Sequence, residues 1–596
     1  MRINGLVYSR NPFTGERNLY GEFRTKNKKE FLLSKLDTKD RLTLEKNIRE
    51  LEKKLKFPVK AALTIHNHSV ILRNVEKITI SVHLHPKMLL HLLDDKIISE
   101  LELFDSFPLR EVNEWLSERI EPRSTDNIIA TCEKITIGAA TGILTQNRDD
   151  VIKWTSLGKK IIWLIDRITA EDVFYFKKVE GLIFTSAGPS SHGAIIAKSL
   201  GKPVIFCPGN LSQSKFLGTA ITLDANNGKI YEGSIPIIRQ TNMKEIKRLV
   251  AIAKRISQVK VAANADTVED AKRANKYFAE GIGVCRTEHM FFHEDREKII
   301  RQILFTQHIS KDSLLKLSTV QSDDFFNLFS EELEKTVVVR LLDAPLHEFI
   351  PKEEKAIEEL ALELGVSKSQ VIENIREFHE ENPMLGYRGI RLLLKRPQII
   401  NVQIMAICNA IRRVKQKFNG RSPNIIIELP MVIDAKEVKA AKYIIEHKVK
   451  TYDHSFRYKI GAMIETPRAC ILIKDIAREV DFISFGTNDL TQTCLAISRD
   501  DTAQFMEFYS LNNLFVCNPF ITIDEKGVGR LMKETIIKAK HANPKIVIGI
   551  CGEHGGDPDS IRFFIRAGID EISCNPTKVP LAILVSAVYS NKKMKR

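Results

Sequence analysis

The chain is 596 residues long, with 43% hydrophobic and 28% charged residues, which predicts about three or four domains and excludes both wholesale disorder and a membrane-embedded body. Lys and Arg outnumber Asp and Glu by 90 to 75. The basic residues are scattered over helical stretches such as LEKNIRELEKKLKF, which indicates a solvated surface and argues against a nucleic-acid partner.

The N-terminus lacks a signal-peptide pattern, and no apolar run approaches the roughly 18 residues of a membrane span. We therefore expect a cytoplasmic protein without a membrane contact. The nine cysteines include no pair at CxxC spacing, which predicts reduced thiols.

The first part of the chain carries no chemical motif. A basic helical stretch is expected from about 38 to 56, an apolar alternation at 61–72, and a second helical stretch that ends near Glu121.

From about 125 to 235, short β-branched runs predict a compact α/β domain; they are EKITIG, KKIIWLI, GLIFTS, KPVIFC, TAITLDA and KIYEG. The segment TSAGPSSHGAIIAKSLGKP then places His192 at the N-terminus of a predicted helix. Free N–H groups there stabilise a bound dianion, and an imidazole can attack phosphorus. The alternative is a histidine that caps the helix or packs in the core.

The final 340 or so residues alternate helices with apolar runs that end in polar residues; the runs are KVAANAD, GIGVCRTE, TVVVRLLD, NIIIELP, KIGAMIET, DFISFGTND and KIVIGICGEHG. Such runs are typical of strands buried on both faces. They predict a (β/α)8 barrel with its catalytic groups at the C-terminal strand ends. An open doubly wound sheet is the alternative, but no run leads into a GxGxxG turn.

Three arginines lie at or near these strand ends. Arg286 and Arg340 follow apolar runs, and Arg388 lies in the loop ENPMLGYRG. Guanidinium groups that converge there would bind a phosphate and a carboxylate, which indicates a small polyanionic substrate. Each of them could instead form a surface ion pair.

Two carboxylates and a thiol complete the candidate site. Glu465 and Asp489 end two successive strand candidates, an arrangement that suits Mg²⁺; the alternative is that each caps the following helix. Cys551 lies in GICGEHGG, where its thiol could serve as a general acid or remain an inert small hydrophobe.

These segments resemble a known family. CRTEHMFF, RLLDAPLHEFIP, ENPMLGYRGIRL, MIETPRA, FISFGTNDLTQTCL and GICGEHGGDPDS are similar to the barrel of pyruvate, phosphate dikinase, and TSAGPSSHGAIIAKSLGKPVIF resembles its phosphohistidine domain. The resemblance covers residues from about 125 to 590. It implies that phosphoenolpyruvate (PEP), bound with Mg²⁺ in the barrel, transfers its phosphoryl group to a histidine on a swivelling domain and leaves pyruvate.

The resemblance also implies roles for individual residues. His192 matches the phosphorylated histidine and Cys551 the proton donor. Glu465 and Asp489 match the magnesium ligands and also contact substrate. The residues that match the family's substrate-binding positions are Arg286, Arg340, Arg388, Gly486, Thr487 and Asn488.

The domain organisation implied by the resemblance departs from the family at the start of the chain. SRNPFTGERNLYGEF resembles a late segment of the family's ATP-grasp domain, and Ala62 stands where that domain has a metal-binding Glu. We therefore expect the ATP half-reaction to be absent. The expected segments are a truncated ATP-grasp remnant with a helical linker (1–120), a phosphohistidine domain (121–240), a linker helix (241–258) and the PEP/pyruvate barrel (259–596).

Two functions from different classes follow. The first is a dikinase-like phosphotransferase that forms a homodimer through the barrel, with a separate protein supplying the phosphoryl acceptor or the nucleotide domain. The second is a catalytically degenerate paralogue that acts as a regulatory or interaction protein. The complete set of residues at the barrel end favours the first function.

Overall fold

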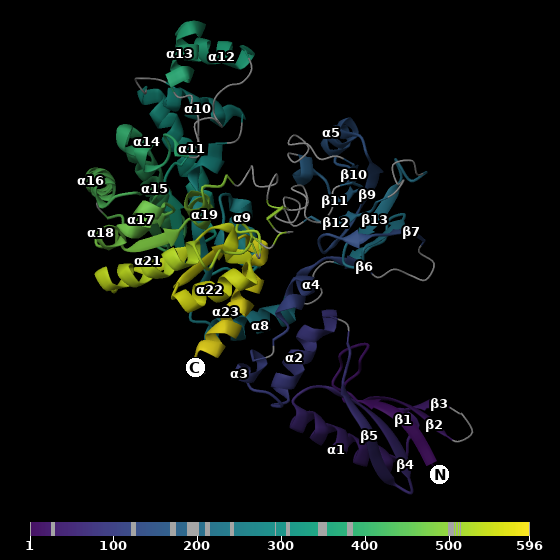
Figure 1. Ribbon diagram of the computed structural model, residues 1–596. Coiled ribbons are helices and arrows are strands. Elements are labelled where there is room, and N and C mark those ends of the chain that lie inside the picture. The colour runs from purple at the N-terminus through teal and green to yellow at the C-terminus, as the bar shows by residue number, and fades with distance from the viewer. Residues whose placement is uncertain are drawn as a thin grey trace. The chain divides into compact units, whose positions relative to one another are not determined.

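The computed structural model divides the chain into two compact units, Met1–Arg255 and Ile256–Arg596, which Figure 1 draws as one ribbon. The structure describes residues 2–25, 30–80, 82–105, 107–120, 127–166, 175–186, 202–208, 215–238, 243–291, 294–305, 310–343, 354–377, 385–453, 455–498, 506, 508–509, 512, 514–515 and 517–594.

The first unit begins with a five-stranded antiparallel sheet in the order β3-β2-β1-β4-β5. The expected helix near its start is α1 (Thr38–Leu55), which lies along the sheet in Figure 1. Leu44 and Ile48 recur at helical spacing on one face of α1 and pack with Val7 and Ala61 of the sheet. The strands are β1 (Arg2–Tyr8), β2 (Tyr20–Thr25), β3 (Glu30–Leu32), β4 (Val59–His66) and β5 (Ser69–Lys77).

The second helical stretch expected before Glu121 is three short helices, and Glu121 itself lies outside the described residues. Ser99 is the N-cap of the helix Glu100–Leu103 and forms a capping box there. Pro108 precedes a single 3-10 turn that leads into the helix Val112–Leu116. The expected continuous helix is therefore interrupted at both of these residues. The elements are α2 (His85–Asp94), α3 (Glu100–Leu103), α4 (Val112–Leu116) and a two-stranded pair of β6 (Arg119–Ile120) with β15 (Ile237–Ile238).

An eight-stranded sheet follows, in the order β7-β14-β13-β9-β10-β11-β12-β8. Its central strands β9 to β12 are parallel, and the outer strands pair antiparallel. The run EKITIG contributes only the two residues of β8, and β9, of sequence AATGILT, was not expected because alanine and glycine dilute its β-branched pattern. The elements are β7 (Ile128–Thr131), β8 (Glu133–Lys134), β9 (Ala139–Thr145), α5 (Arg148–Ser156), β10 (Ile161–Ile165), β11 (Gly181–Phe184), β12 (Val204–Phe206), β13 (Ala220–Asp224) and β14 (Lys229–Glu232).

A disulfide joins Cys132 and Cys207 in this sheet, with their Cα atoms 4.8 Å apart. The expectation of reduced thiols is therefore wrong for these two residues. Cys132 lies between β7 and β8, and Cys207 directly follows β12, the strand that pairs with β8. Because 75 residues separate the two cysteines, only this strand pairing brings them together.

The second unit is built on a closed parallel barrel of eight strands, β16 to β23. Pairing of β16 with β23 closes the ring, so the predicted barrel is confirmed and the open sheet is excluded. The eighth strand was not expected, because β23 has only four residues and includes Glu571 and Ser573. The strands are β16 (Lys260–Asn264), β17 (Gly281–Arg286), β18 (Thr336–Arg340), β19 (Asn424–Leu429), β20 (Tyr458–Ile464), β21 (Phe482–Phe485), β22 (Val547–Ile550) and β23 (Glu571–Cys574).

Helices alternate with these strands and pack around the barrel (Figure 1). Neighbouring helices contact one another in the pairs α11/α15, α15/α16, α18/α21 and α22/α23. None of the described helices is long and apolar enough to cross a bilayer. The helices of this unit are α9 (Val268–Lys276), α10 (Glu294–Phe305), α11 (Lys311–Ser330), α12 (Glu354–Leu364), α13 (Lys368–Glu377), α14 (Ile390–Lys395), α15 (Pro397–Lys417), α16 (Ala435–Tyr452), α17 (Pro467–Ile471), α18 (Ile473–Ala477), α19 (Thr487–Leu495), α21 (Val528–Ala542), α22 (Pro558–Ala567) and α23 (Val579–Met594). The preceding helix, α8 (Met243–Ile256), belongs up to Arg255 to the first unit.

Candidate active site

Five of the predicted site residues lie where barrel strands end. Arg286 is the last residue of β17, and Arg340 is the last residue of β18. Glu465 directly follows β20, Gly486 follows β21, and Cys551 follows β22. The carboxyl ends of parallel strands open on one rim, so these residues share one end of the barrel.

Asp266 holds Arg286 at this rim. The arginine donates from Nη2 to Oδ2 of Asp266 at 2.6 Å, and its backbone N–H donates to Oδ1 at 2.8 Å. His289 Nδ1 also lies 2.8 Å from Oδ2. Burial alone would raise the pKa of Asp266, but His289 and Arg286 hold it well below its usual range. The guanidinium is thus fixed in direction while its side chain stays 36% exposed.

Asp343 holds the other two arginines. Arg388 donates to both of its oxygens, from Nε at 2.8 Å and from Nη2 at 2.6 Å, and Arg340 Nη1 lies 3.3 Å from Oδ2. Arg340 also donates to Glu288. The alternative of surface ion pairs does not apply here, because the Arg340 and Arg388 side chains are only 9% and 5% exposed. Buried charges of this kind are stable only when they are paired.

The backbone beside Arg388 depends on Gly389. This residue has a φ of +59°, and an added Cβ would lie 2.8 Å from Cβ of Met431 and 3.1 Å from Oδ1 of Asp343. A side chain here would therefore both strain the backbone and press on the carboxylate that holds Arg388.

Glu465 is fully buried and has one unused oxygen. Its Oε1 accepts a hydrogen bond from the Met431 backbone N–H at 2.7 Å, whereas Oε2 has no partner among the described residues. Thr466, not Glu465, caps the helix that follows, so the capping alternative is wrong for Glu465. Burial, and then the charge of Asp489, raises the pKa of Glu465. An added Cβ at Gly486 would lie 2.5 Å from Oε2, so glycine leaves the room around this oxygen.

Asp489 lies in the first turn of α19, one strand further round the barrel. Gly486 is the N-cap of this helix and Asp489 makes no capping bond; its Oδ1 accepts from Gln492 at 3.2 Å and lies 3.8 Å from Nη1 of Arg388. A divalent cation with oxygen ligands fits this pair, because Glu465 presents an unpaired oxygen and Asp489 a partly exposed carboxylate.

The residues between Gly486 and Asp489 are tied to the loop after β22. Asn488 Oδ1 accepts from the Glu553 backbone N–H at 3.1 Å, and Thr487 Oγ1 lies 2.8 Å from Nδ1 of His554. Gly552 is essential to this contact, since a Cβ there would lie 1.9 Å from Thr487 Oγ1. The two strand ends therefore form one connected surface.

Cys551 is partly exposed on this surface. Its Sγ lies 3.8 Å from Oγ of Ser484 and 3.8 Å from the carbonyl oxygen of Phe485. Burial, and then the charge of Glu428, raises the pKa of the thiol, which favours a proton donor over a nucleophile. His192, the remaining predicted residue, lies outside the described residues.

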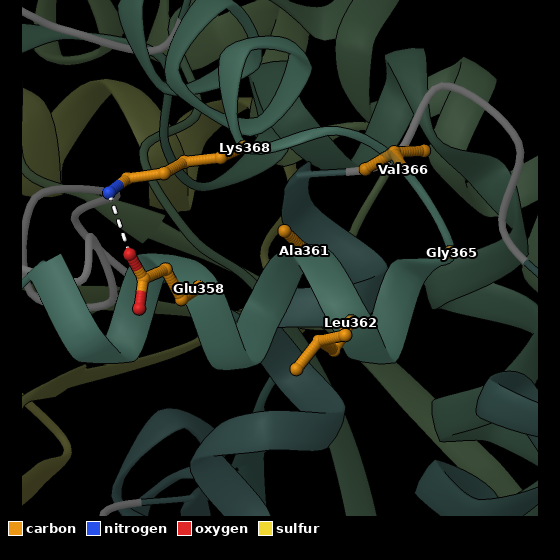
Figure 2. Close-up of a pocket in the computed structure, with 6 residues that line it drawn as sticks. All are labelled: Glu358, Ala361, Leu362, Gly365, Val366 and Lys368. Atoms are coloured by element: carbon orange, nitrogen blue, oxygen red, sulfur yellow. Dashed lines mark hydrogen bonds and ion pairs between the residues drawn. The ribbon is translucent and has the colours of Figure 1, made fainter.

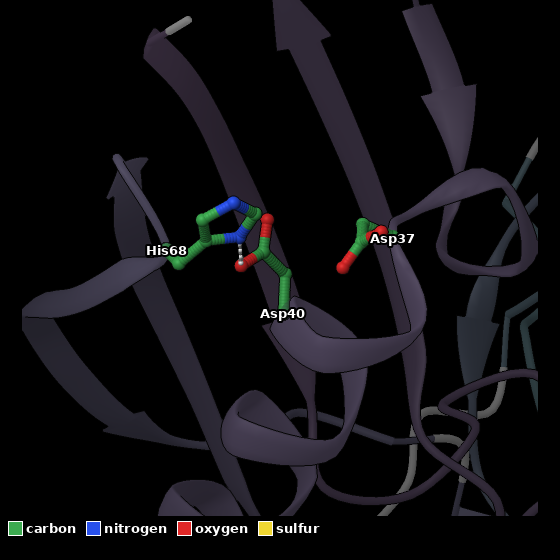
Figure 3. A group of neighbouring side chains, drawn as sticks. All are labelled: Asp37, Asp40 and His68. Carbon is green, nitrogen blue, oxygen red and sulfur yellow. Dashed lines mark hydrogen bonds and ion pairs between the residues drawn. The ribbon is translucent and has the colours of Figure 1, made fainter.

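Two other features lie away from this rim. A pocket of about 500 Å³ on α12 and α13 contains none of the predicted site residues, as Figure 2 shows; it is lined by Glu358, Ala361, Leu362, Gly365, Val366 and Lys368. In the first unit, Asp37, Asp40 and His68 lie together (Figure 3). Asp37 caps α1 and Asp40 pairs with His68 at 2.9 Å, so this cluster is explained without a metal.

Comparisons with known proteins agree with this geometry. Residues 240–588 match the PEP-binding domain of PEP-utilising enzymes, and residues 157–228 match their mobile domain. The chain is 34% identical to pyruvate, phosphate dikinase from Rickettsia prowazekii, over 98% of this chain and 70% of that protein. The chain belongs to the pyruvate, phosphate dikinase family. It is also 32% identical to the chloroplastic pyruvate, phosphate dikinase of Mesembryanthemum crystallinum (98% and 65% covered) and 31% identical to that of Clostridium symbiosum (98% and 70%).

Membership of the dikinase family confirms the predicted resemblance and makes the chain a phosphotransferase. Sequence reasoning missed the acidic residues that hold the three arginines at the rim. Asp266 and Asp343 end the runs KVAANAD and TVVVRLLD, so the strand-end rule that selected Glu465 could also have selected them. Glu428, inside the apolar run NIIIELP, carried a different signal, which is a charge within a buried strand.

Proposed function

We propose that the chain transfers a phosphoryl group between PEP and His192 with Mg²⁺ and so forms pyruvate. One observation carries the proposal: the barrel rim gathers fixed arginines beside a buried carboxylate with an unpaired oxygen, Oε2 of Glu465. Such a rim is complementary to a small polyanion that brings oxygen atoms to a cation.

The arginines would bind the substrate. PEP has a phosphate and a carboxylate, and the fork of a guanidinium matches both groups. Asp266 and Asp343 fix Arg286, Arg340 and Arg388 before the substrate arrives, so little conformational entropy is lost on binding. Gly486, Thr487 and Asn488 would line the same surface, with Gly486 leaving the room that the substrate and the cation need.

Glu465 and Asp489 would hold Mg²⁺. When bound, the ion supplies positive charge that polarises the substrate oxygens. The residues perform the remaining steps. The imidazole of His192 attacks phosphorus, so that a P–N bond forms as the P–O bond to the enol oxygen breaks. The thiol of Cys551 gives a proton to C3 of the enolate, and solvent restores the thiol.

The first prediction concerns His192. Incubation of the wild-type chain with Mg²⁺ and PEP labelled in the phosphoryl group should give an acid-labile, base-stable phosphoprotein, because phosphohistidine has that stability. His192→Ala should abolish the label, and His447→Ala, which removes an exposed histidine on α16, should retain it. Label that persists in His192→Ala would remove this residue from the mechanism. No label in the wild type would favour the regulatory alternative.

We further infer that the chain pairs with a second copy through its barrel, and that a separate protein accepts the phosphoryl group or supplies the nucleotide domain.

We also infer that these 596 residues do not carry the ATP half-reaction. A nucleotide site of this kind needs cationic groups on the phosphates and carboxylates on Mg²⁺. The position that matches the metal-binding Glu is Ala62 on β4, next to Leu6 of β1 and Asn74 of β5.

The second prediction follows. Calorimetry at 0.15 M ionic strength, where exposed charges more than about 8 Å apart are screened, should detect no Mg²⁺-dependent ATP binding by the 596-residue chain. His192 should also receive no label from ATP and phosphate in the absence of a partner protein. Micromolar, magnesium-dependent affinity for ATP would show that residues 2–120 form a working nucleotide site.

A further inference from the structure

Glu428 places a carboxyl group inside an otherwise apolar strand of the barrel. It lies on β19, among Ile425, Ile426 and Ile427, and is fully buried. Its Oε2 has no hydrogen-bond partner among the described residues. A buried carboxyl with an unsatisfied oxygen costs stability, so its position calls for a functional explanation.

A chain of contacts leads from this carboxyl to the thiol at the rim. Ser484 Oγ lies 2.5 Å from Oε1 of Glu428 and 3.8 Å from Sγ of Cys551. The hydroxyl donates to Glu428 when the carboxyl is ionised, and it can accept from the carboxyl when Glu428 is protonated. Ser484 is on β21, two strands from β19, and residues from alternate strands share one layer of a barrel core. The register partner of Glu428 on the intervening β20 is Gly461, which has no side chain to separate them.

The groups that face Glu428 set its charge. Burial raises its pKa to about 7, partly opposed by the hydrogen bond from Ser484 and the charge of Arg340, and Glu571 on β23 adds to the rise. Glu428 therefore holds a proton below about pH 7 and loses it above. The carboxyl can thus exchange a proton near neutrality.

We propose that Glu428 is the proton reservoir for Cys551, which it reaches through the hydroxyl of Ser484. The inference rests on the proposed function, in which Cys551 protonates the enolate. When the S–H bond breaks and C3 receives the proton, Ser484 gives its hydroxyl proton to Sγ and takes the carboxyl proton of Glu428 on the same oxygen. The hydroxyl and the thiol are restored, the negative charge ends on Glu428, and solvent returns one proton to it for each pyruvate formed.

The third prediction is that Glu428→Gln slows solvent-hydrogen exchange at pyruvate C3 by about tenfold, less than the roughly hundredfold or greater effect of losing a direct general acid. In the wild type the exchange rate should fall as pH rises through about 7, because Glu428 loses its proton there. This pH dependence should be absent in the variant. Labelling of His192 from PEP should be retained, because phosphoryl transfer precedes protonation. Deuterium incorporation followed by NMR across pH measures the first two effects.

Three variants distinguish a relay from a structural role. Ser484→Ala should reproduce the loss, and Ser484→Thr, which keeps a hydroxyl, should restore most of the exchange. Glu332→Gln is the matched control, because Glu332 is another buried carboxyl with a raised pKa, held by Asn275 away from the rim. Wild-type exchange and pH dependence in Glu428→Gln, or an equal loss in Glu332→Gln, would overturn the relay.

A second measurement tests the coupling between Glu428 and Cys551 without PEP. It therefore remains informative if the wild type takes no label from PEP, a result that would reject the proposed function but not this coupling. The Glu428 carboxylate raises the pKa of Cys551, so Glu428→Gln should lower it and increase the thiolate fraction. Alkylation of Cys551 by iodoacetamide at pH 8, resolved by peptide mass spectrometry, should be severalfold faster in Glu428→Gln and unchanged in Glu332→Gln. Equal rates in all three proteins would show that the two groups are not coupled.

Discussion

Glu465→Gln is expected to reduce magnesium-dependent pyruvate formation from PEP by at least about a hundredfold, because a cation that stabilises charge in the reaction contributes several kcal/mol. The amide keeps the shape of the carboxylate and the acceptor for the Met431 backbone N–H. It removes the negative charge and the unpaired oxygen that would bind the ion. The effect should be measured as pyruvate release over a range of Mg²⁺ concentrations.

The same substitution should leave the fold intact. Oε2 of Glu465 has no partner among the described residues, and a neutral amide is cheaper to bury than an unpaired carboxylate. The melting temperature should therefore match that of the wild type. Asp489→Asn, which neutralises the second carboxylate, should show the same separation between activity and stability. Parallel loss of melting temperature and activity in both variants would make these residues structural.

The barrel could be predicted because its determinants are local. Seven strands are apolar on consecutive residues and end in polar groups, as strands buried on both faces must be. The eighth, β23, is only four residues long, and its pairing with β16 at the other end of the barrel sequence defines it. The Cys132–Cys207 disulfide was missed for the same reason, since the pairing of two distant strands creates it.

The candidate site shows the same division. The strand-end rule is local, and it found Arg286, Arg340 and Glu465 without knowledge of the fold. The partners of these residues depend on tertiary contacts. Asp343 and Arg388 form hydrogen bonds although 45 positions separate them in the sequence, and Glu428 and Ser484 do so at a separation of 56 positions. The hydrophobic periodicity of the sequence does not predict which distant residues form such pairs. A charged residue within an apolar run, such as Glu428, is the sequence feature that could have identified one partner.

Asp343→Asn is expected to destabilise the barrel by about 3–5 kcal/mol, the cost of leaving a buried charge without its partner. Arg388 would lose a bidentate contact of 2.8 and 2.6 Å, and Arg340 would lose its neighbour at 3.3 Å. Both arginine side chains are almost fully buried, so water cannot replace the lost carboxylate charge. The affinity for PEP should fall with stability, and both can be measured, by urea denaturation and by calorimetry.

Asp324→Asn is the matched control for this experiment. Asp324 also binds both terminal nitrogens of an arginine, Arg296, at 2.6 and 3.2 Å, but that pair is 23% to 32% exposed. Its loss should cost no more than about 1 kcal/mol, as for surface ion pairs. A double variant, Asp343→Asn with Arg388→Gln, removes the arginine charge that loses most of its pairing, because Arg340 keeps its contact with Glu288. It should therefore recover part of the lost stability without recovering affinity for PEP. If Asp343→Asn costs no more stability than Asp324→Asn, the two arginines do not depend on Asp343 for their charge balance, and the fixed rim that the proposed function needs must be held in another way.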